Sequence, residues 1–336
     1  MEEMPFTLRT ERSADQPVIR QANCPTSRLA GFPTGQSAGQ PENRQTDKQA
    51  QQPTGRYADR QTDRQARVPT GQQVINDIKR EERMKKEPLF IAFSTQKGGA
   101  GKTTLTVLMA SYLYYMKGYD VAVVDCDYPQ FSIKDMRERD LKNIERNPYL
   151  RKLAYDQFRH IGKRAYPIVG SRPDNAMEAV KPFIESETPP DFIFFDLTGT
   201  VNNLDLIKTV ATMDYIFCPI AADRFVMESS LKYASIINDT LVTTGKSNIK
   251  GIRLLWNMVD KREKTDLYDI YEKVIAGMGL EVLNTCLPDS KRFRKEGSEE
   301  GDRPFFRSTL LPPDKVLAKG SGIEALAEEI LSIVKR

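Results

Sequence analysis

Beyond about residue 84, apolar residues gather in short runs that alternate with longer segments of helical length. Each run is rich in β-branched and aromatic residues and is almost continuously apolar, as expected for strands buried on both faces of a sheet. We expect strands at 88–94, 119–125, 191–197, 214–220, 250–257 and 280–286. The helical candidates are 102–117, 131–146, 173–186, 224–243 and 264–277. This alternation predicts an α/β fold with a mostly parallel sheet and helices on both faces.

The final segment, 321–336, has the pattern of an amphipathic helix. It opens with a Ser-x-x-Glu capping box at Ser321 and Glu324. One face of this helix would carry Ile323, Leu326, Ile330 and Val334. Because the opposite face is mostly acidic, we expect the helix to pack on the sheet rather than on an anionic membrane surface.

Residues 1–83 have a different pattern, rich in Gln, Arg, Thr, Pro and Gly with almost no aliphatic runs. The string RQTDKQA at 44–50 returns as RQTDRQA at 60–66, sixteen residues later. A repeat without an apolar face cannot offset the entropy of ordering. We therefore expect a disordered, low-complexity extension over 1–83 and one domain over 84–336. A basic arm that contacts nucleic acid is the alternative for the extension.

Composition excludes several classes of protein. No stretch approaches the roughly 20 apolar residues of a membrane-spanning helix, and the start lacks the order of a secretion signal, so we expect a cytoplasmic protein without membrane insertion. Four scattered Cys and one His argue against a disulfide framework, a structural zinc site and a Ser–His–Asp hydrolase. A net charge of +4 is too small for a histone-like protein but permits local basic patches.

The segment 96–104, QKGGAGKTT, lies between the first predicted strand and a helix. Glycines let the backbone turn its N–H groups around a phosphate chain, and the helix N-terminus adds its positive end. Lys102 would reach the β- and γ-phosphates and Thr103 would offer a hydroxyl to Mg²⁺. We therefore expect ATP and Mg²⁺ as cofactors. The phosphate-binding candidates are Gly98, Gly99, Ala100, Gly101, Lys102, Thr103 and Thr104.

The form K-G-G-x-G-K-T-T, with its second lysine at Lys97, resembles the ParA/MinD family of deviant Walker-type ATPases over about 84–336. The resemblance implies a P-loop NTPase fold and a homodimer that sandwiches two ATP molecules. It also implies that Lys97 acts across the interface on the partner's γ-phosphate, as an arginine finger does elsewhere.

Three carboxylates follow predicted strands, at the edge where parallel sheets bind ligands. Asp125 and Asp127 end one strand, and Asp196 ends another in the manner of a Walker B element. The resemblance assigns Asp127 to the attacking water, Asp125 to the outer shell of Mg²⁺, and Asp196 to Mg²⁺ through water. Lys97, Lys102 and Asp127 would then be the catalytic residues. A helix cap is the alternative for each Asp of the D-x-D pair.

The resemblance also suggests how the adenine base is bound. Asn257, at the end of its predicted strand, matches the family's adenine-binding Asn, which can both donate and accept hydrogen bonds. Pro288 and Asp289 lie where the family's backbone reads the exocyclic amine. A strand-ending cap is the alternative for Asn257.

Missing features separate this chain from several relatives. It has no paired cysteines like those of iron–sulfur members, no terminal tyrosine cluster and no basic C-terminal helix. DNA-partitioning members grip DNA without sequence preference through Lys and Arg on the rim of the dimer. The candidates here are Lys246, Lys250, Arg253, Lys261, Arg262 and Lys264, and Lys291, Arg292, Arg294 and Lys295 around Phe293. For each run, a solvated surface is the alternative.

We therefore expect an ATPase that dimerises on ATP, binds DNA nonspecifically in that state and is then associated with the nucleoid. It would position or segregate a plasmid or a conjugative element, and within the family it looks most like the transfer-operon (TraA-like) type. A separate activator, ParB-like or a transfer-complex component, would trigger hydrolysis, and the charged insertion at 131–170 would contact partners. The alternatives are a MinD-like membrane-associated positioning ATPase and a non-hydrolysing, nucleotide-dependent scaffold.

Overall fold

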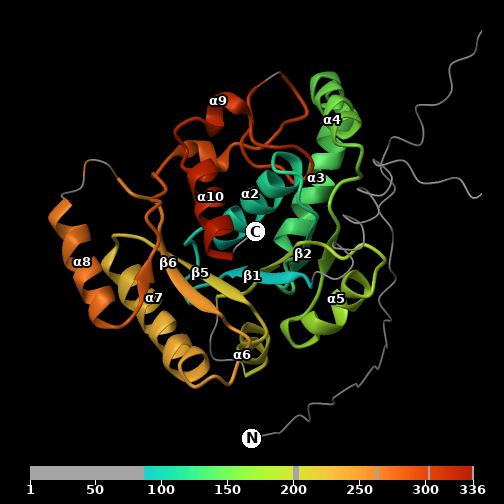
Figure 1. The fold of residues 1–336 in the computed structure, drawn as a ribbon. Coiled ribbons are helices and arrows are strands. Elements are labelled where there is room, and N and C mark those ends of the chain that lie inside the picture. Colours follow the sequence, from blue (N-terminus) through green and yellow to red (C-terminus); the bar gives the residue numbers. More distant parts are fainter. Residues whose placement is uncertain (1–86, 200–203, 261, 263–264, 302, 335–336) are drawn as a thin grey trace, which may run out of the picture. The chain divides into compact units, whose positions relative to one another are not determined.

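The computed structural model describes residues 87–199, 204–260, 262, 265–301 and 303–334, so the predicted extension at 1–83 lies outside the described residues. The described strands form one sheet in the order β3-β2-β4-β1-β5-β6-β7, with every neighbouring pair parallel (Figure 1). The strands are β1 (Leu89–Phe93), β2 (Val121–Asp125), β3 (Ile168–Gly170), β4 (Phe192–Asp196), β5 (Tyr215–Ile220), β6 (Gly251–Trp256) and β7 (Glu281–Val282). The predicted fold class is confirmed.

Helices cover both faces of the sheet (Figure 1). One face, which includes Ile91 and Phe93, packs against α2 (Lys102–Tyr115), α3 (Ser132–Arg146) and α10 (Ile323–Val334). The other face, which includes Ala92 and Val124, packs against α5 (Ala176–Ile184), α6 (Leu204–Ala211), α7 (Arg224–Ile237) and α8 (Thr265–Gly277). The remaining helical elements are α4 (Pro148–Ile161), α9 (Lys315–Ala318), η2 (Pro173–Asn175), η3 (Asn238–Val242) and η4 (Lys291–Arg294).

The helix α2 lies at the centre of its layer, and every residue from Leu105 to Tyr115 is buried. A helix that is apolar nearly all round is expected in such a position. Two of its hydroxyl groups bond to a distant segment: the Ser111 hydroxyl donates to the Ser308 carbonyl at 2.6 Å, and the Tyr115 hydroxyl to the Thr309 carbonyl at 2.9 Å. These bonds fasten residues 308–309 to the helix.

The charged segment 131–170 forms α3, α4 and the edge strand β3. Asn147 joins the two helices, because its side-chain oxygen accepts the Tyr149 N–H at 2.9 Å and so caps α4. The same side chain donates to the Ser298 and Gly301 carbonyls at 3.1 and 2.9 Å. The helix pair is therefore tied to the loop that follows η4.

The C-terminal helix lies where the hydrophobic pattern predicted. Ser321 accepts the Ile323 N–H at 3.2 Å at the helix start. The four apolar positions, Ile323, Leu326, Ile330 and Val334, are buried in the same core as α2. Among the described residues, no helix has the length and apolar character to cross a membrane.

Candidate functional site

The loop between β1 and α2 is shaped by its glycines. Gly99 and Gly101 have φ angles of 79° and 90°, a left-handed conformation that glycine adopts at little cost. A Cβ atom on Gly101 would lie 2.7 Å from Asn257 Nδ2, whereas one on Gly98 or Gly99 would meet nothing within 4 Å. The loop is therefore tight against β6 on one side and open on the other, where a ligand can approach the backbone.

The start of α2 offers backbone donors to an anion. The first intrahelical bond runs from Leu105 N to Gly101 O at 2.9 Å, and Gly101 has no side chain with which to cap the helix. An α-helix leaves its first N–H groups without intrahelical acceptors, and its N-terminus carries partial positive charge. This end of α2 can therefore bind phosphate oxygens.

Lys102 bridges the loop from inside. Its Nζ donates to the Lys97 carbonyl at 3.1 Å. Burial lowers the pKa of Lys102, while the charges of Asp196 and Asp127 raise it. A Cβ on Gly199 would lie 2.9 Å from the Gln96 carbonyl and 3.3 Å from Lys102 Nζ, so the chain after β4 lies directly against the loop.

Asp196, at the end of β4, is 1% exposed, and neither carboxylate oxygen has a hydrogen-bond partner among the described residues. Burial raises the pKa of Asp196 to about 7, although the Thr103 hydroxyl and the charge of Lys102 oppose the rise. The Thr103 hydroxyl is near Asp196 but makes no hydrogen bond to either carboxylate oxygen. A buried carboxylate without such partners fits a site that binds water or a cation.

Thr103 and Asp196 fit a hydrated Mg²⁺. The ion prefers oxygen ligands and keeps several waters, so one hydroxyl and one carboxylate reached through water suffice beside nucleotide phosphates. In the described part of the chain, no three His, Cys, Asp or Glu side chains lie close enough together to hold a metal ion by themselves. The donor set therefore suits a metal that arrives with phosphate.

Asp125 makes the contacts of a helix cap. Its Oδ2 accepts the Ile133 and Lys134 N–H groups at 2.8 and 3.1 Å, at the start of α3, and its Oδ1 accepts the Asp127 N–H at 3.2 Å. Burial raises the pKa of Asp125, and these three bonds oppose the rise. The cap was the alternative considered from the sequence, and the outer-shell role of Asp125 stays a prediction.

Asp127 and Lys97 are more accessible. Asp127 is partly exposed, and its Oδ2 accepts the Ser132 hydroxyl at 3.1 Å. Lys97 is exposed on the loop. Their predicted roles toward water and toward a partner's phosphate remain predictions.

A pocket opens beside the start of α2. It is lined by Gly101, Thr104, Leu105, Asn257, Met258, Pro288, Asp289, Ser290, Phe293 and Arg294. The structure thus brings together the three predicted adenine-binding residues, although they come from separate segments.

Two features of this pocket were missed from the sequence. Asn257 Nδ2 donates to the Ala100 carbonyl at 2.9 Å, which ties β6 to the phosphate loop. Arg307 Nη1 donates to Thr104 Oγ1 at 2.7 Å across 203 residues of sequence. No local motif marks either contact, because each joins residues that only the fold brings together.

Many of the predicted DNA-contacting cations are already engaged. Lys250 pairs with Asp214 and Arg253 with Glu281, both at 2.7 Å, and Arg262 pairs with Asp260 at 2.6 Å. Arg292 Nη1 donates to the Leu317 and Lys319 carbonyls at 2.8 Å. Lys261 and Lys264 lie outside the described residues. Among the residues that the structure describes, Lys246, Lys291, Arg294 and Lys295 are the exposed candidates that form no ion pair.

Comparison with known proteins gives one family and several relatives. Residues 91–302 match a family described as the CobQ/CobB/MinD/ParA nucleotide binding domain. The uncharacterized protein BBD21 of Borreliella burgdorferi is 28% identical over an alignment of 208 residues, and the match covers 54% of this chain and 83% of the relative.

Solved structures with a similar fold include an AMPPNP-bound protein of Borrelia burgdorferi B31, described as a plasmid partition protein. It is 15% identical, with a TM-score of 0.46, and the match covers 74% of this chain and 99% of that one. The cell division ATPase MinD of Pyrococcus furiosus is 18% identical, with a TM-score of 0.46 and coverage of 73% and 99%.

Proposed function

Because the chain belongs to the CobQ/CobB/MinD/ParA nucleotide-binding domain family, whose match spans more than half of it, we propose that it is an Mg²⁺-dependent ATPase. It dimerises on ATP and hydrolyses the nucleotide to ADP and phosphate. The observation that carries the proposal is the buried, unpartnered carboxylate of Asp196 beside Lys102 and Thr103. This arrangement is unfavourable alone and becomes favourable when a cation and phosphates share the site.

Each residue of the site has a role in this proposal. The loop backbone and Lys102 bind the phosphate chain, and Asn257, Pro288 and Asp289 bind the base. Thr103 and Asp196 hold Mg²⁺, which supplies positive charge to the phosphate oxygens when bound. Asp127 orients the attacking water, and Lys97 of one protomer stabilises charge at the other protomer's site.

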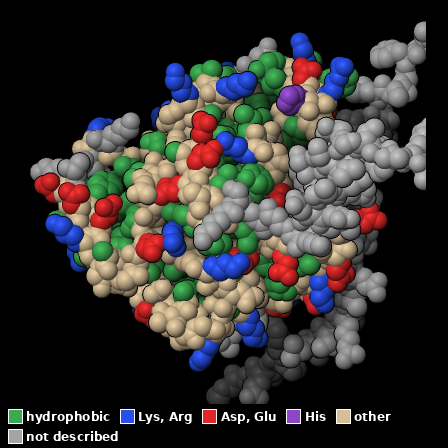
Figure 2. All heavy atoms as spheres, in the orientation of Figure 1, with side chains coloured by type: hydrophobic (Ala, Val, Ile, Leu, Met, Phe, Trp, Pro, Cys, Tyr) green, Lys and Arg blue, Asp and Glu red, His purple; other side chains and the backbone are tan. Residues whose placement is uncertain are grey.

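We further propose that the ATP-bound dimer binds DNA without sequence preference, and so associates with the nucleoid. Positive and negative side chains are interspersed on the face shown in Figure 2, so this face of one protomer presents no large basic area. Lys291, Arg294 and Lys295 are exposed and close together in sequence, and Arg294 lines the nucleotide pocket. Two such groups held in one dimer double the phosphate contacts, which makes DNA binding depend on ATP.

The cargo in this proposal is a plasmid or a conjugative element, released when a separate activator triggers hydrolysis. The conjugative alternative rests on sequence resemblance alone. A MinD-like role on membranes is disfavoured by α10, whose apolar face is already buried in the core.

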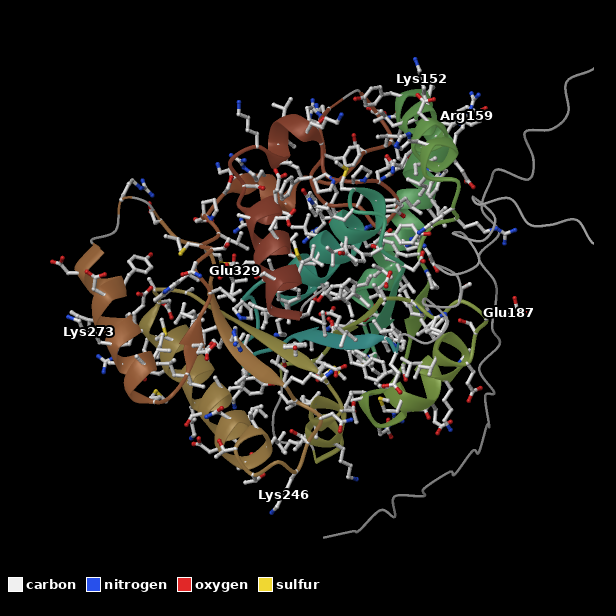
Figure 3. All side chains as sticks on the ribbon, in the orientation of Figure 1. Lys152, Arg159, Glu187, Lys246, Lys273 and Glu329 are labelled. Carbon is white, nitrogen blue, oxygen red and sulfur yellow. The ribbon has the colours of Figure 1, made fainter. Side chains whose placement is uncertain are left out.

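The test is sedimentation of the full chain with random-sequence DNA in the presence of ATP, ADP or no nucleotide. We expect retention only with ATP, and its loss in raised salt and in Lys97→Ala. Lys291→Glu/Lys295→Glu should abolish retention. The control Lys181→Glu/Lys273→Glu makes the same charge change on α5 and α8, and should retain DNA (Lys273 is labelled in Figure 3). Equal retention with ATP and ADP would exclude an ATP-dependent DNA switch.

Turnover is measured separately, since it can be low without an activator. Asp127→Ala should remove whatever ATP hydrolysis the wild type shows. Nucleotide binding without any turnover, unchanged by Asp127→Ala, would instead favour the non-hydrolysing scaffold.

A further inference from the structure

Arg307 is held firmly beside the phosphate loop. The N–H groups of Phe306 and Arg307 both donate to the Lys295 carbonyl, at 2.8 and 2.9 Å, and close the loop that follows η4. Phe306 is fully buried and packs edge-on against Phe293, with ring centroids 5.2 Å apart. Two residues further on, Thr309 N donates to the buried carboxylate of Asp140 at 2.6 Å. The backbone at 306–309 is therefore fixed to α2 and α3.

The Arg307 side chain is 20% exposed and divides its donors between two partners. Its Nη1 donates to Thr104 Oγ1 at 2.7 Å, and its Nε donates to Glu296 Oε1 at 3.1 Å. Glu296 also accepts from Arg139 of α3 at 3.3 Å. Glu296 thus orients the guanidinium group and lowers the cost of burying it, while one N–H of Arg307 points at the start of α2.

The bond to Thr104 has a chemical consequence. A hydroxyl group has one hydrogen to donate and two lone pairs to accept with. Because Thr104 Oγ1 accepts from a cation, its hydrogen is left for another acceptor, and the donor is polarised by the charge behind it. Thr104 lies in the first turn of α2 and lines the pocket, so a phosphate oxygen bound at the helix start is the acceptor that this geometry favours.

We propose that Arg307 is a positioning residue for the nucleotide, which acts on the phosphate chain through the Thr104 hydroxyl. The proposal rests on the proposed nucleotide-binding function and adds a residue outside every motif of the site. Because the contact is at the start of α2 rather than at the far end of the phosphate chain, Arg307 supports ADP and ATP alike.

The test is a double-mutant cycle on nucleotide affinity, measured by calorimetry with Mg²⁺-ADP and Mg²⁺-ATP on the full chain. Arg307→Ala and Thr104→Val should each weaken both nucleotides about tenfold, the size expected for a hydrogen bond to a charged group. The double variant should be no weaker than Thr104→Val alone, because Arg307 acts through that hydroxyl. Arg307→Lys should recover part of the affinity, since it keeps the charge but loses the forked geometry.

Arg146→Ala is the matched control. It removes another arginine–glutamate pair on the same loop, with Glu299 at 2.6 Å, and should leave affinity unchanged. If Arg307→Ala lowers the melting temperature, the double variant decides, because a loss of affinity caused by lost stability would persist in the Thr104→Val background.

Unchanged affinity in Arg307→Ala would overturn the inference. The inference would also be overturned if the two losses of nucleotide affinity multiplied in the double variant, because Arg307 would then act independently of Thr104. A wild type that binds neither nucleotide would instead refute the proposed function itself.

Discussion

We expect Asp196 to make the stability of the nucleotide-free protein depend on pH. Burial raises the pKa of Asp196 to about 7, against about 3.9 for an unfolded Asp. Between these values the folded state binds more protons than the unfolded state, so this group's contribution to stability falls as pH rises from about 4 to 7 and then levels off. We expect the free energy of unfolding of the Asp196→Asn variant to be higher than that of the wild type by up to about 4 kcal/mol at pH 8, and not higher near pH 4.

The measurement is urea denaturation of both proteins in EDTA across this pH range. Asp125 and Asp140 also have raised pKa values through burial, so the difference between the two proteins is the quantity to read. A difference that does not change with pH would show that Asp196 is ionised or solvated in the folded protein.

Gly101 and Gly98 are two glycines of the same loop with different requirements. Gly101→Ala places a Cβ 2.7 Å from Asn257 Nδ2 at a φ of 90°, so we expect a loss of about 1–3 kcal/mol and weaker nucleotide binding. Gly98→Ala meets open space and should change stability by less than about 1 kcal/mol. Thermal denaturation and ADP titration check both. Equal losses in the two variants would mean that the Asn257 contact does not constrain the loop.

At the scale of elements, α10 is predicted to be a core helix. Leu326 and Ile330 are fully buried, so Leu326→Ala and Ile330→Ala should each lower the free energy of unfolding by about 2–5 kcal/mol. The polar side is also engaged, since Glu329 (labelled in Figure 3) accepts the Asn284 and Thr285 N–H groups at 2.7 and 2.8 Å. Denaturation and flotation with anionic vesicles check the prediction. Variants that keep full stability but lose vesicle binding would support a membrane helix.

The elements that could be predicted are those with continuous local patterns. The long apolar runs identified six of the strands. Because β1, the glycine-rich loop and α2 are adjacent in sequence, this strand–loop–helix unit could also be predicted directly. The strand β3 was missed because it has three residues, and its place depends on pairing with β2 at Val123–Asp125. The predicted strand at 280–286 shortens to two residues in β7. Arg307 was missed for the same reason as β3: only tertiary contact gives it a partner.

For the whole molecule, the predicted dimer can be tested by mixing inactive variants. Lys97→Ala and Asp127→Ala should each be inactive alone. If Lys97 acts across the interface, a mixed dimer has one site with both groups intact. Equal mixing should then restore about one quarter of wild-type turnover, because half of the dimers are mixed and half of their sites are complete. No recovery, with mixed dimers verified by crosslinking, would mean that Lys97 acts on its own protomer's nucleotide.

The buried position of α2 limits how the structure can change between nucleotide states. The helix that would receive the phosphate chain is surrounded by sheet and helices and cannot tilt without opening a packed core. Two nucleotide states of the chain should therefore superimpose over the sheet and its covering helices and differ only along the edge where the strands end. A binding protein selected to distinguish those states would have to contact that edge, and amide hydrogens inside α2 would exchange equally slowly in both.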